Sequence, residues 1–296
     1  MSKFKALDEN FNLVDKRVIV RADLNVPIKN GKIIDASRIK KVAPIIKELI
    51  KKKAKIILIS HLGRPKGKKS KKLSLSLLVP ALHKILKAKI HFSKKICGSN
   101  VVKKSKKIKS GEILLLENIR FNKAEELNSI SFAKNLSRNG DIYINEAFSC
   151  SHREHASVCE ITNHIKSYAG KLLIEEVSAI NMLTNTAKKP ITCIIGGSKI
   201  STKIGVLSNL IKKMQTIIIV GAMANNFIKY EGYNIGKSLC ENNQEQLIKS
   251  IINQCKKNNC NLVFPQDVIV SKNYNLKGNL KNLDDIDKTD IILDIG

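Results

Sequence analysis

The stretch RVIVRADLNVP, residues 17–27, sets the pattern that the rest of the chain follows. Its opening residues, Arg17 to Val20, are typical of a short buried strand, and two polar residues, Asp23 and Asn25, come soon afterwards. Asp23 and Asn25 alternate with apolar residues, so both side chains are predicted to point to the same side. Taken alone, the stretch is better explained as an Asx-type turn ahead of Pro27. Its meaning therefore depends on whether other strands end in the same way.

Strand-like and helix-like segments alternate after this stretch. Apolar residues recur at helical spacing over residues 37–53, and a short apolar run follows at residues 56–60. Further strands are predicted at 90–92, 113–116 and 142–144, and further helices at 75–86 and 130–136. This βαβα pattern predicts an α/β domain, in which a parallel sheet is covered by helices.

A second alternation follows a segment that is predicted to be a connecting helix, and that segment ends near Pro190. Strands are then predicted at 191–195, 216–220, 261–264 and 290–293, with helices at 201–214, 223–230 and 244–257. The predicted division is an N-terminal domain at 1–170, an interdomain helix at 171–189 and a C-terminal domain at 190–296. A doubly wound nucleotide domain typically has about six strands, and only about four are predicted here, so the second domain is expected to be incomplete.

The formal net charge of +28 raises the hypothesis of a nucleic-acid-binding protein. The composition argues against it, because only seven of the 53 basic residues are arginine and aromatic residues make up 4% of the chain, with no tryptophan. Aromatic platforms that stack on bases are therefore scarce. A solvated lysine-rich surface is the favoured interpretation, and no nucleic-acid partner is predicted.

A cytoplasmic protein is predicted, with no membrane contact. No apolar stretch reaches the ~18 residues that a membrane span needs, and the first ten residues lack the apolar core of a secretory signal. Seven cysteines without a CxxC pair favour a reducing compartment over a disulfide framework. A zinc site at Cys150, His152, His155 and Cys159 is a minor alternative, since all four residue types are good ligands.

Polar and basic residues gather at five places that we expect to converge on one rim of the first sheet. Four of these places follow predicted strands, and the fifth is a predicted helix start, from which Arg38 is expected to reach back over the sheet edge. The rim residues are Asp23, Asn25, Arg38, His61, Arg64, Arg120 and Arg153. Arginine is scarce in this chain, and its planar fork grips carboxylate and phosphate groups in bidentate fashion. Each arginine alone is explained equally well as a surface residue in an ion pair, but together they suit a small acid that bears carboxylate and phosphate.

In the second domain, the run from Gly196 to Lys199 follows a predicted strand and precedes a predicted helix. Such a turn lets the backbone approach a phosphate closely and offers free amide groups. Lys199 and Lys203 lie four residues apart and are predicted to share one face of the first helical turns, where their repulsion favours a bound anion.

Six segments together resemble phosphoglycerate kinase: RVIVRADLNVP, SHLGRPKG, LLENIRF, NEAF with HREHAS, IIGGSKISTKIGVL and MANNFIKYEGYNIGKSL. The resemblance covers the whole chain and sets the zinc alternative aside. It implies two Rossmann-like parallel-sheet domains joined by a helix. It also implies the glycolytic transfer of a phosphoryl group between 1,3-bisphosphoglycerate and ADP, giving 3-phosphoglycerate and ATP reversibly. Mg²⁺ bound through the nucleotide, a monomer and hinge bending are expected, and no residue of the chain is predicted to bind a metal.

The resemblance also implies roles for individual residues. Asp23 and Asn25 are expected at the hydroxyl and carboxyl end of 3-phosphoglycerate, and Arg38 near the transferred phosphoryl group. The expected substrate-binding set is Asp23, Leu24, Asn25, Arg38, His61, Leu62, Gly63, Arg64, Arg120 and Arg153, with His61 and the last three arginines around the phosphate. The expected nucleotide-binding set is Gly196, Gly197, Ser198, Lys199, Lys203, Gly221 and Ala222, with the last two beside the adenine. The expected catalytic residues are Arg38, Lys199 and Lys203. Because the acceptor carboxylate is already deprotonated at neutral pH, positioning and charge neutralisation are expected to replace a general base.

Some positions depart from the family pattern. Leu24, Ala222 and Glu146 stand where the family often has Phe, Gly and Asp, and the turn after Arg120 lacks a common Gly, so its shape is expected to differ. The family also continues beyond Gly296, through further strands and a Gly-rich loop. The alternative function is therefore a non-catalytic fragment that binds phosphoglycerate.

Overall fold

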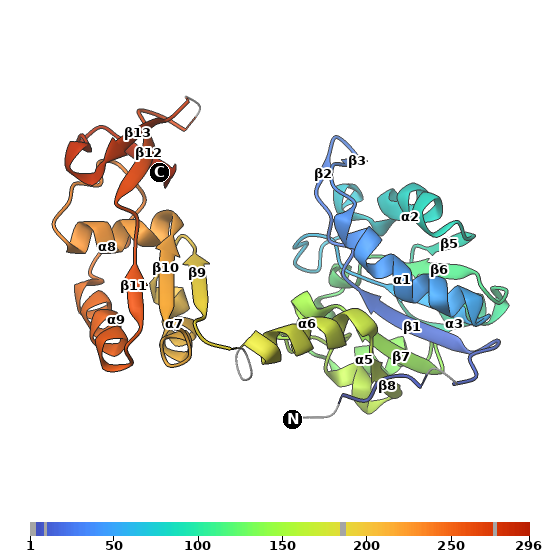
Figure 1. Ribbon diagram of the computed structural model, residues 1–296. Coiled ribbons are helices and arrows are strands. Elements are labelled where there is room, and N and C mark those ends of the chain that lie inside the picture. Colours follow the sequence, from blue (N-terminus) through green and yellow to red (C-terminus); the bar gives the residue numbers. More distant parts are fainter. Residues whose placement is uncertain (1–3, 9–10, 184–187, 275–276) are drawn as a thin grey trace. The chain divides into compact units, whose positions relative to one another are not determined.

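The computed structural model describes residues 4–8, 11–183, 188–274 and 277–296 (Figure 1). Contacts within the chain define two compact units, unit 1 (Met1–Asn181) and unit 2 (Met182–Gly296). No helix in those described ranges is long and apolar enough to cross a membrane. The domain bounds and the connecting segment inferred from the sequence stay a prediction, and residues 184–187 of that segment lie outside the described residues.

Unit 1 is built on a six-stranded sheet in the order β5-β6-β4-β1-β7-β8. Its strands are β1 (Arg17–Ala22), β4 (Lys55–Ile59), β5 (Ile90–Ser93), β6 (Ile113–Leu116), β7 (Ile142–Glu146) and β8 (Lys166–Ala169). All neighbours pair in parallel, and β1 lies between β4 and β7. A short antiparallel hairpin, β2 (Ile28–Lys29) with β3 (Lys32–Ile33), follows β1. The predicted parallel sheet is confirmed.

Helices cover both faces of this sheet (Figure 1). On one face, α1 (Ser37–Lys51) and α2 (Val79–Leu86) share a buried apolar cluster with Val18 of β1. On the other face, α3 (Ser99–Lys107) and α5 (Ile130–Ser137) share a second cluster with Ile19. Successive residues of β1 are therefore buried on opposite faces, which is why the strand is a continuous apolar run. The remaining helical segments of unit 1 are α4 (Lys123–Glu126), α6 (Lys171–Asn181), η1 (Lys71–Leu73), η2 (Leu75–Leu78), η3 (Ile119–Phe121), η4 (Phe148–Cys150) and η5 (Glu160–Asn163), where η marks a 3₁₀ helix.

Two differences from the predicted helices have local causes. The helix predicted at 75–86 is α-helical only from Val79, because Pro80 in its first turn has no N–H and cannot donate an α-helical hydrogen bond to the carbonyl of Ser76. Upstream of Val79 the chain forms the 3₁₀ segment η2. Helix α3 was not predicted, because its lysine-rich sequence has few apolar residues to give a helical period.

Unit 2 contains a parallel sheet in the order β11-β10-β9 and an antiparallel sheet in the order β13-β12-β14. The strands are β9 (Thr192–Gly196), β10 (Thr216–Val220), β11 (Asn261–Val263), β12 (Asp267–Ser271), β13 (Asn279–Asn282) and β14 (Ile291–Ile295). The helices are α7 (Ile204–Ile211), α8 (Ala224–Tyr230) and α9 (Glu245–Lys257), with 3₁₀ segments η7 (Ser201–Lys203), η8 (Gly221–Met223) and η9 (Leu283–Asp285). Residues from all three α-helices and from β10 share one buried cluster.

The strand predicted at 290–293 does not continue the parallel alternation. It corresponds to β14, which pairs antiparallel with β12 in the separate sheet. β12 and β13 were not predicted, and the sequence of β13, NLKN, has no apolar run that would indicate a strand.

Candidate active site

The carboxyl ends of four parallel strands form one edge of the unit 1 sheet, here called the rim. Asp23 follows β1, His61 follows β4, Arg120 follows β6 and Arg153 follows β7. Parallel strands present their carboxyl ends on the same side, so these residues share the edge. Arg38 is the fifth contribution: it lies in the first turn of α1, the helix start that the sequence indicated, and it reaches the rim through an ion pair with Asp23.

Asp23 accepts three hydrogen bonds at the centre of the rim. Its Oδ1 accepts from the backbone N–H of Asn25 at 3.0 Å, which is an Asx turn. Its Oδ2 accepts from the Arg38 guanidinium and from the Ser149 hydroxyl, the latter at 2.5 Å. Asp23 is only 9% exposed, so these donors hold its carboxylate in place. The stretch after β1 therefore forms both the turn and the rim that its sequence suggested.

Gly63 links the loop after β4 to two other rim residues. Its N–H donates to Asn25 Oδ1 at 2.7 Å, and its carbonyl accepts from Arg120 Nη1 at 3.0 Å. The φ angle of Gly63 is +62°, and a Cβ there would lie 2.8 Å from Leu73 Cδ2, so glycine is favoured at this position. The neighbouring Leu62 is buried with 2% exposure, as is Leu24 with 0%. Both leucines pack in the core, where the Leu24 N–H donates to Ser60 Oγ at 3.0 Å and the Leu62 carbonyl accepts from Asn118 Nδ2 at 2.8 Å.

His61 is a buried, neutral imidazole in a positively charged surrounding. Its Nδ1 lies 3.2 Å from Arg21 Nη2, and because a guanidinium only donates, Nδ1 must accept and the ring proton must lie on Nε2. Burial, followed by the charges of Arg21, Arg120 and Arg153, lowers the pKa of His61 to about 2. At neutral pH the ring therefore offers a single N–H, at Nε2.

Arg21 is a further residue of this cluster that the predicted site left out. It is fully buried, and its Nε donates to Ser157 Oγ at 3.2 Å. Ser157 Oγ donates in turn to Glu125 Oε1 at 2.6 Å, and Glu125 is also fully buried. An arginine inside an apolar strand signals a buried partner. The sequence does not reveal that this partner is Ser157, or that Ser157 is bonded in turn to Glu125 of α4. The turn after Arg120 forms this short helix, and its difference from the family pattern stays a prediction.

Two predicted arginines extend from the rim without a protein partner. Arg64 is exposed and Arg153 is half-buried, and neither guanidinium has a hydrogen bond or ion pair to any residue in the described ranges. Arg153 nevertheless contributes to lowering the pKa of His61, so its charge lies near the imidazole. These two guanidinium groups leave the rim with positive charge that no carboxylate of the described chain neutralises.

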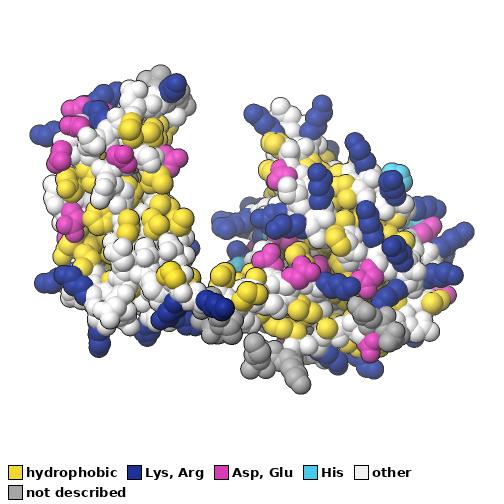
Figure 2. Space-filling model, in the orientation of Figure 1, with side chains coloured by type: hydrophobic (Ala, Val, Ile, Leu, Met, Phe, Trp, Pro, Cys, Tyr) yellow, Lys and Arg dark blue, Asp and Glu magenta, His cyan; other side chains and the backbone are white. Residues whose placement is uncertain are grey.

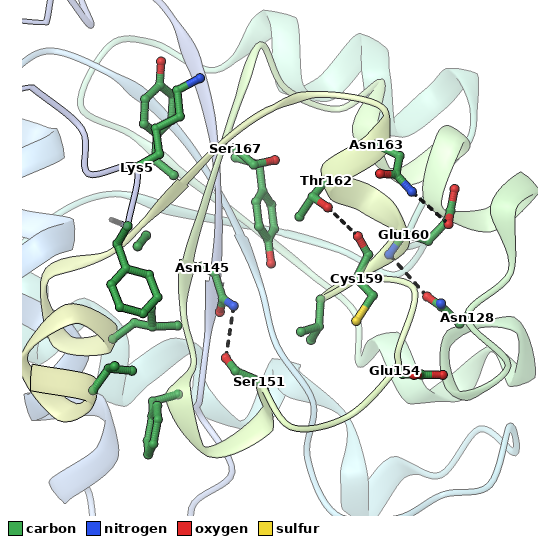
Figure 3. A pocket seen from close by; sticks show the side chains of 18 residues that line it. Lys5, Asn128, Asn145, Ser151, Glu154, Cys159, Glu160, Thr162, Asn163 and Ser167 are labelled. Carbon is green, nitrogen blue, oxygen red and sulfur yellow. Dashed lines mark hydrogen bonds between the residues drawn. The ribbon is translucent and has the colours of Figure 1, made fainter. Parts of the chain in front are cut away.

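Asp23 and Arg38 also line a cavity of about 350 Å³ that includes Ser149 and Glu146. A cavity of about 820 Å³ elsewhere in unit 1 contains none of the predicted residues (Figure 3). Several of its polar side chains bond within the protein, as Asn145 Nδ2 does to Ser151 Oγ at 3.1 Å. The predicted residues thus belong to the rim and its smaller cavity.

In unit 2, the turns that follow β9 and β10 pack against each other. The Met223 N–H donates to the Gly197 carbonyl at 2.8 Å. Gly221 has a φ angle of +65°, and a Cβ on it would lie 3.6 Å from the nitrogen and oxygen of Gly197. The Lys203 side chain reaches the same turn, since its Cε lies 3.9 Å from where a Cβ of Gly197 would be. Gly197, Gly221 and Lys203 are therefore brought together.

Lys199 does not share a helical face with Lys203, so that prediction is wrong. Lys203 ends the 3₁₀ segment η7, whereas Lys199 and Ser198 lie before it in irregular chain and are exposed. The start of η7 is fixed by Glu241, whose carboxylate accepts from the Ser201 N–H at 3.0 Å and hydroxyl at 2.7 Å. The helical pattern therefore begins after Lys199.

Gly221 and Ala222 line a cavity of about 170 Å³ in unit 2. Its walls are mainly apolar, with Ile228, Val268 and Ile292 among them. Gly196 ends β9 next to this region, and a Cβ on it would lie 2.9 Å from Val220 Cγ2. A mainly apolar lining with a few polar groups is typical of small-molecule sites.

Comparison with known proteins assigns the chain. It matches the family model for phosphoglycerate kinase over residues 8–296. The phosphoglycerate kinase of Sinorhizobium fredii is 43% identical over 271 residues, which are 92% of this chain and 68% of that protein. The phosphoglycerate kinase of Wolbachia pipientis is 45% identical over 289 residues, 97% of this chain and 73% of that protein. The chain belongs to the phosphoglycerate kinase family.

Solved structures agree with this assignment. The phosphoglycerate kinase of Coxiella burnetii has a TM-score of 0.80 and 38% identity, and the match covers 99% of this chain and 75% of that one. The predicted family and the two-domain Rossmann-like fold are thus confirmed. With the family comes its activity, so the prediction of a phosphotransferase that acts as a phosphoglycerate kinase is also confirmed.

A phosphoglycerate kinase acts on phosphorylated anions, and the charge of this chain suits such substrates. Lys and Arg side chains are spread over the face of unit 1 that Figure 2 shows. This scatter agrees with the solvated lysine-rich surface inferred from composition. A net charge of +28 attracts small polyanions by long-range steering.

Proposed function

We propose that the rim of unit 1 binds 3-phosphoglycerate and 1,3-bisphosphoglycerate. The supporting observation is that strand ends and one helix start gather Asp23, Arg38, His61, Arg120 and Arg153 at a single edge of the sheet. A phosphorylated acid supplies the negative charge that this edge lacks. Arginine forks suit it because they bind carboxylate and phosphate oxygens with two hydrogen bonds at once.

The groups of the rim divide between the two ends of the substrate. Arg64, Arg120 and Arg153 bind the non-transferred phosphate, and the Nε2–H of His61 adds one neutral donor. Asp23 and Asn25 orient the hydroxyl and carboxyl end, with the backbone of Leu24, Leu62 and Gly63 alongside. Arg38 neutralises charge on the group that is transferred.

The turns of unit 2 form the nucleotide half of the site in this proposal. The backbone from Gly196 to Lys199 approaches the phosphates, Lys199 and Lys203 neutralise them, and Gly221 and Ala222 border the adenine. The proximity of Gly197, Gly221 and Lys203 supports it. Mg²⁺ enters with the nucleotide as part of the substrate, held by phosphate oxygens and water.

The transfer itself requires positioning more than acid–base chemistry. The attacking group of 3-phosphoglycerate is a carboxylate, which carries no proton at neutral pH, so the chain needs no general base. Arg38, Lys199 and Lys203 lower the barrier by stabilising charge on the transferred group. The proposal includes hinge bending to exclude water during transfer, a monomer and a cytoplasmic location.

The experiment is a coupled assay of ATP formation from 1,3-bisphosphoglycerate and MgADP. Arg38→Ala should lower kcat by about 100-fold or more, because the preorganised positive charge of the guanidinium no longer stabilises the transferred group. Arg138→Ala is the matched control, an exposed arginine that follows α5 and is not part of the rim, and it should stay within about twofold. An unchanged rate in Arg38→Ala would contradict the proposal. A folded chain that binds phosphoglycerate without turnover would instead support the non-catalytic alternative.

A further inference from the structure

The carboxylate of Asp23 is held by two donors that reach the same oxygen from different elements. Arg38, from the start of α1, and Ser149, from η4 after β7, both donate to Oδ2. The hydroxyl of Ser149 lies 2.5 Å from that oxygen. All three residues line the cavity of about 350 Å³ at the rim. Ser149 was not among the predicted site residues.

The two donors differ in charge and length: Arg38 carries a positive charge on a long side chain, whereas Ser149 is neutral and short, and both residues are exposed. The Arg38 side chain is 48% exposed, whereas that of Asp23 is 12% exposed. Arg38 is the one cationic partner in an ion pair with Asp23 among the residues that the structure describes. When Arg38 turns toward the transferred phosphoryl group, it therefore takes away the positive charge beside a carboxylate that is largely shielded from water.

We propose that Ser149 is a positioning residue, whose hydroxyl holds Asp23 Oδ2 when Arg38 turns to the substrate. The inference rests on the proposed function of the rim. After Arg38 leaves, Asp23 keeps the Asn25 N–H on Oδ1 and the Ser149 hydroxyl on Oδ2. The carboxylate then stays in the orientation that receives the substrate hydroxyl, and its desolvation is partly compensated.

The turn that carries Ser149 is itself fixed, which allows it to act as a support. The Cys150 N–H donates to the Ala147 carbonyl at 3.0 Å, and the Ala147 N–H donates to Asn145 Oδ1 at 3.0 Å. Cys150 is buried, with its Sγ 3.9 Å from His61 Nδ1. The backbone that carries Ser149 is therefore fixed on both sides, whereas Arg38 reaches the same oxygen through a long, half-exposed side chain.

Calorimetric titration with 3-phosphoglycerate tests this role in variants of the full chain. Ser149→Ala should weaken binding by about tenfold, the effect of one hydrogen bond to a charged group. Ser149→Thr keeps a hydroxyl and should restore affinity to within about threefold. Ser99→Ala is the matched control: it is an exposed serine at the start of α3, and it does not line the rim cavity. It should change affinity by less than about twofold, and MgADP affinity should be unchanged in all variants.

A double-mutant cycle separates positioning from a general loss of folding. In an Asp23→Ala background, Ser149→Ala should weaken 3-phosphoglycerate binding by less than about twofold more, since its target is gone. Equal affinity of wild type and Ser149→Ala for 3-phosphoglycerate would overturn the inference and leave the proposed function intact. A full tenfold loss of affinity on adding Ser149→Ala to Asp23→Ala would do the same. Absence of 3-phosphoglycerate binding by the folded wild-type chain would overturn both.

Discussion

Replacing Glu146 with glutamine should remove a pH-dependent loss of stability. Glu146 ends β7 and is 2% exposed. Its Oε1 accepts from the Leu172 N–H at 2.8 Å, but its Oε2 has no hydrogen-bond partner in the described chain. Burial, together with the nearby carboxylates of Glu175 on α6 and Glu48 on α1, raises the pKa of Glu146 to about 7, against the opposing effects of the Leu172 N–H and Lys171.

The magnitude follows from proton linkage. The native carboxyl keeps its proton up to about pH 7, whereas in the unfolded chain the proton leaves near 4.5. The native state therefore binds more protons between these values, and the stability of the wild type falls as pH rises from 4.5 to about 7. The total loss is about 3 kcal/mol, and it is complete above pH 7.

Urea unfolding followed by circular dichroism at several values between pH 4.5 and pH 8 measures this. The stability of Glu146→Gln relative to wild type should increase by about 3 kcal/mol across that range, since glutamine does not ionise. Glu154→Gln, an exposed carboxylate in the same part of unit 1, is the control and should show no such trend. If the difference in unfolding free energy between Glu146→Gln and wild type does not vary with pH, the Glu146 carboxyl does not have a raised pKa in the folded chain.

Three further changes test other parts of the structure. Asn118→Ala should destabilise unit 1 by about 2–4 kcal/mol in urea unfolding, because the buried amide donates to the carbonyls of Leu62 and Leu73 at 2.8 and 2.9 Å. A loss of less than about 1 kcal/mol would contradict this prediction. Gly221→Ala should cost about 1–2 kcal/mol by the same method, since alanine disfavours a φ angle of +65°, and an unchanged midpoint would show that the turn relaxes freely. Lys203→Met should weaken MgADP binding in calorimetry by about tenfold or more through the loss of one cation at the phosphates, and unaltered affinity would exclude that role.

The sequence predicted the parts of the fold that local pattern controls. β1, β4, β6 and β10 are buried on both faces or nearly so, and their apolar runs identified them within one or two residues. Segments without such a period were missed, such as the lysine-rich α3 and the polar β13. β14 was identified as a strand, but its antiparallel pairing depends on distant residues of β12 and is not encoded locally.

For the candidate site, sequence reasoning found the residues with unusual chemistry in loops but not those that support them. Asp23, His61 and Arg120 follow strands, so topology alone places them at one edge. Ser149 and Arg21 were not chosen, because a serine in a turn and an arginine in a strand gain meaning only from their partners, Asp23 and Ser157. Long-range hydrogen bonds of this kind have no period or spacing in the sequence.

In the proposed function, the rim of unit 1 binds the acid substrate. Calorimetric titration of the full chain with 3-phosphoglycerate tests it most directly, beside the Arg64→Ala, Arg153→Ala double variant. Neither guanidinium has a partner within the described residues, so the double variant should fold normally. A charge-matched control is Lys134→Ala, Arg138→Ala, two exposed residues near the end of α5.

If the rim binds the acid substrate, the wild type and the control should bind 3-phosphoglycerate saturably, and the affinity of the double variant should be lower by about 100-fold or more. Equal binding by all three proteins, or no binding by a folded wild type, would contradict it.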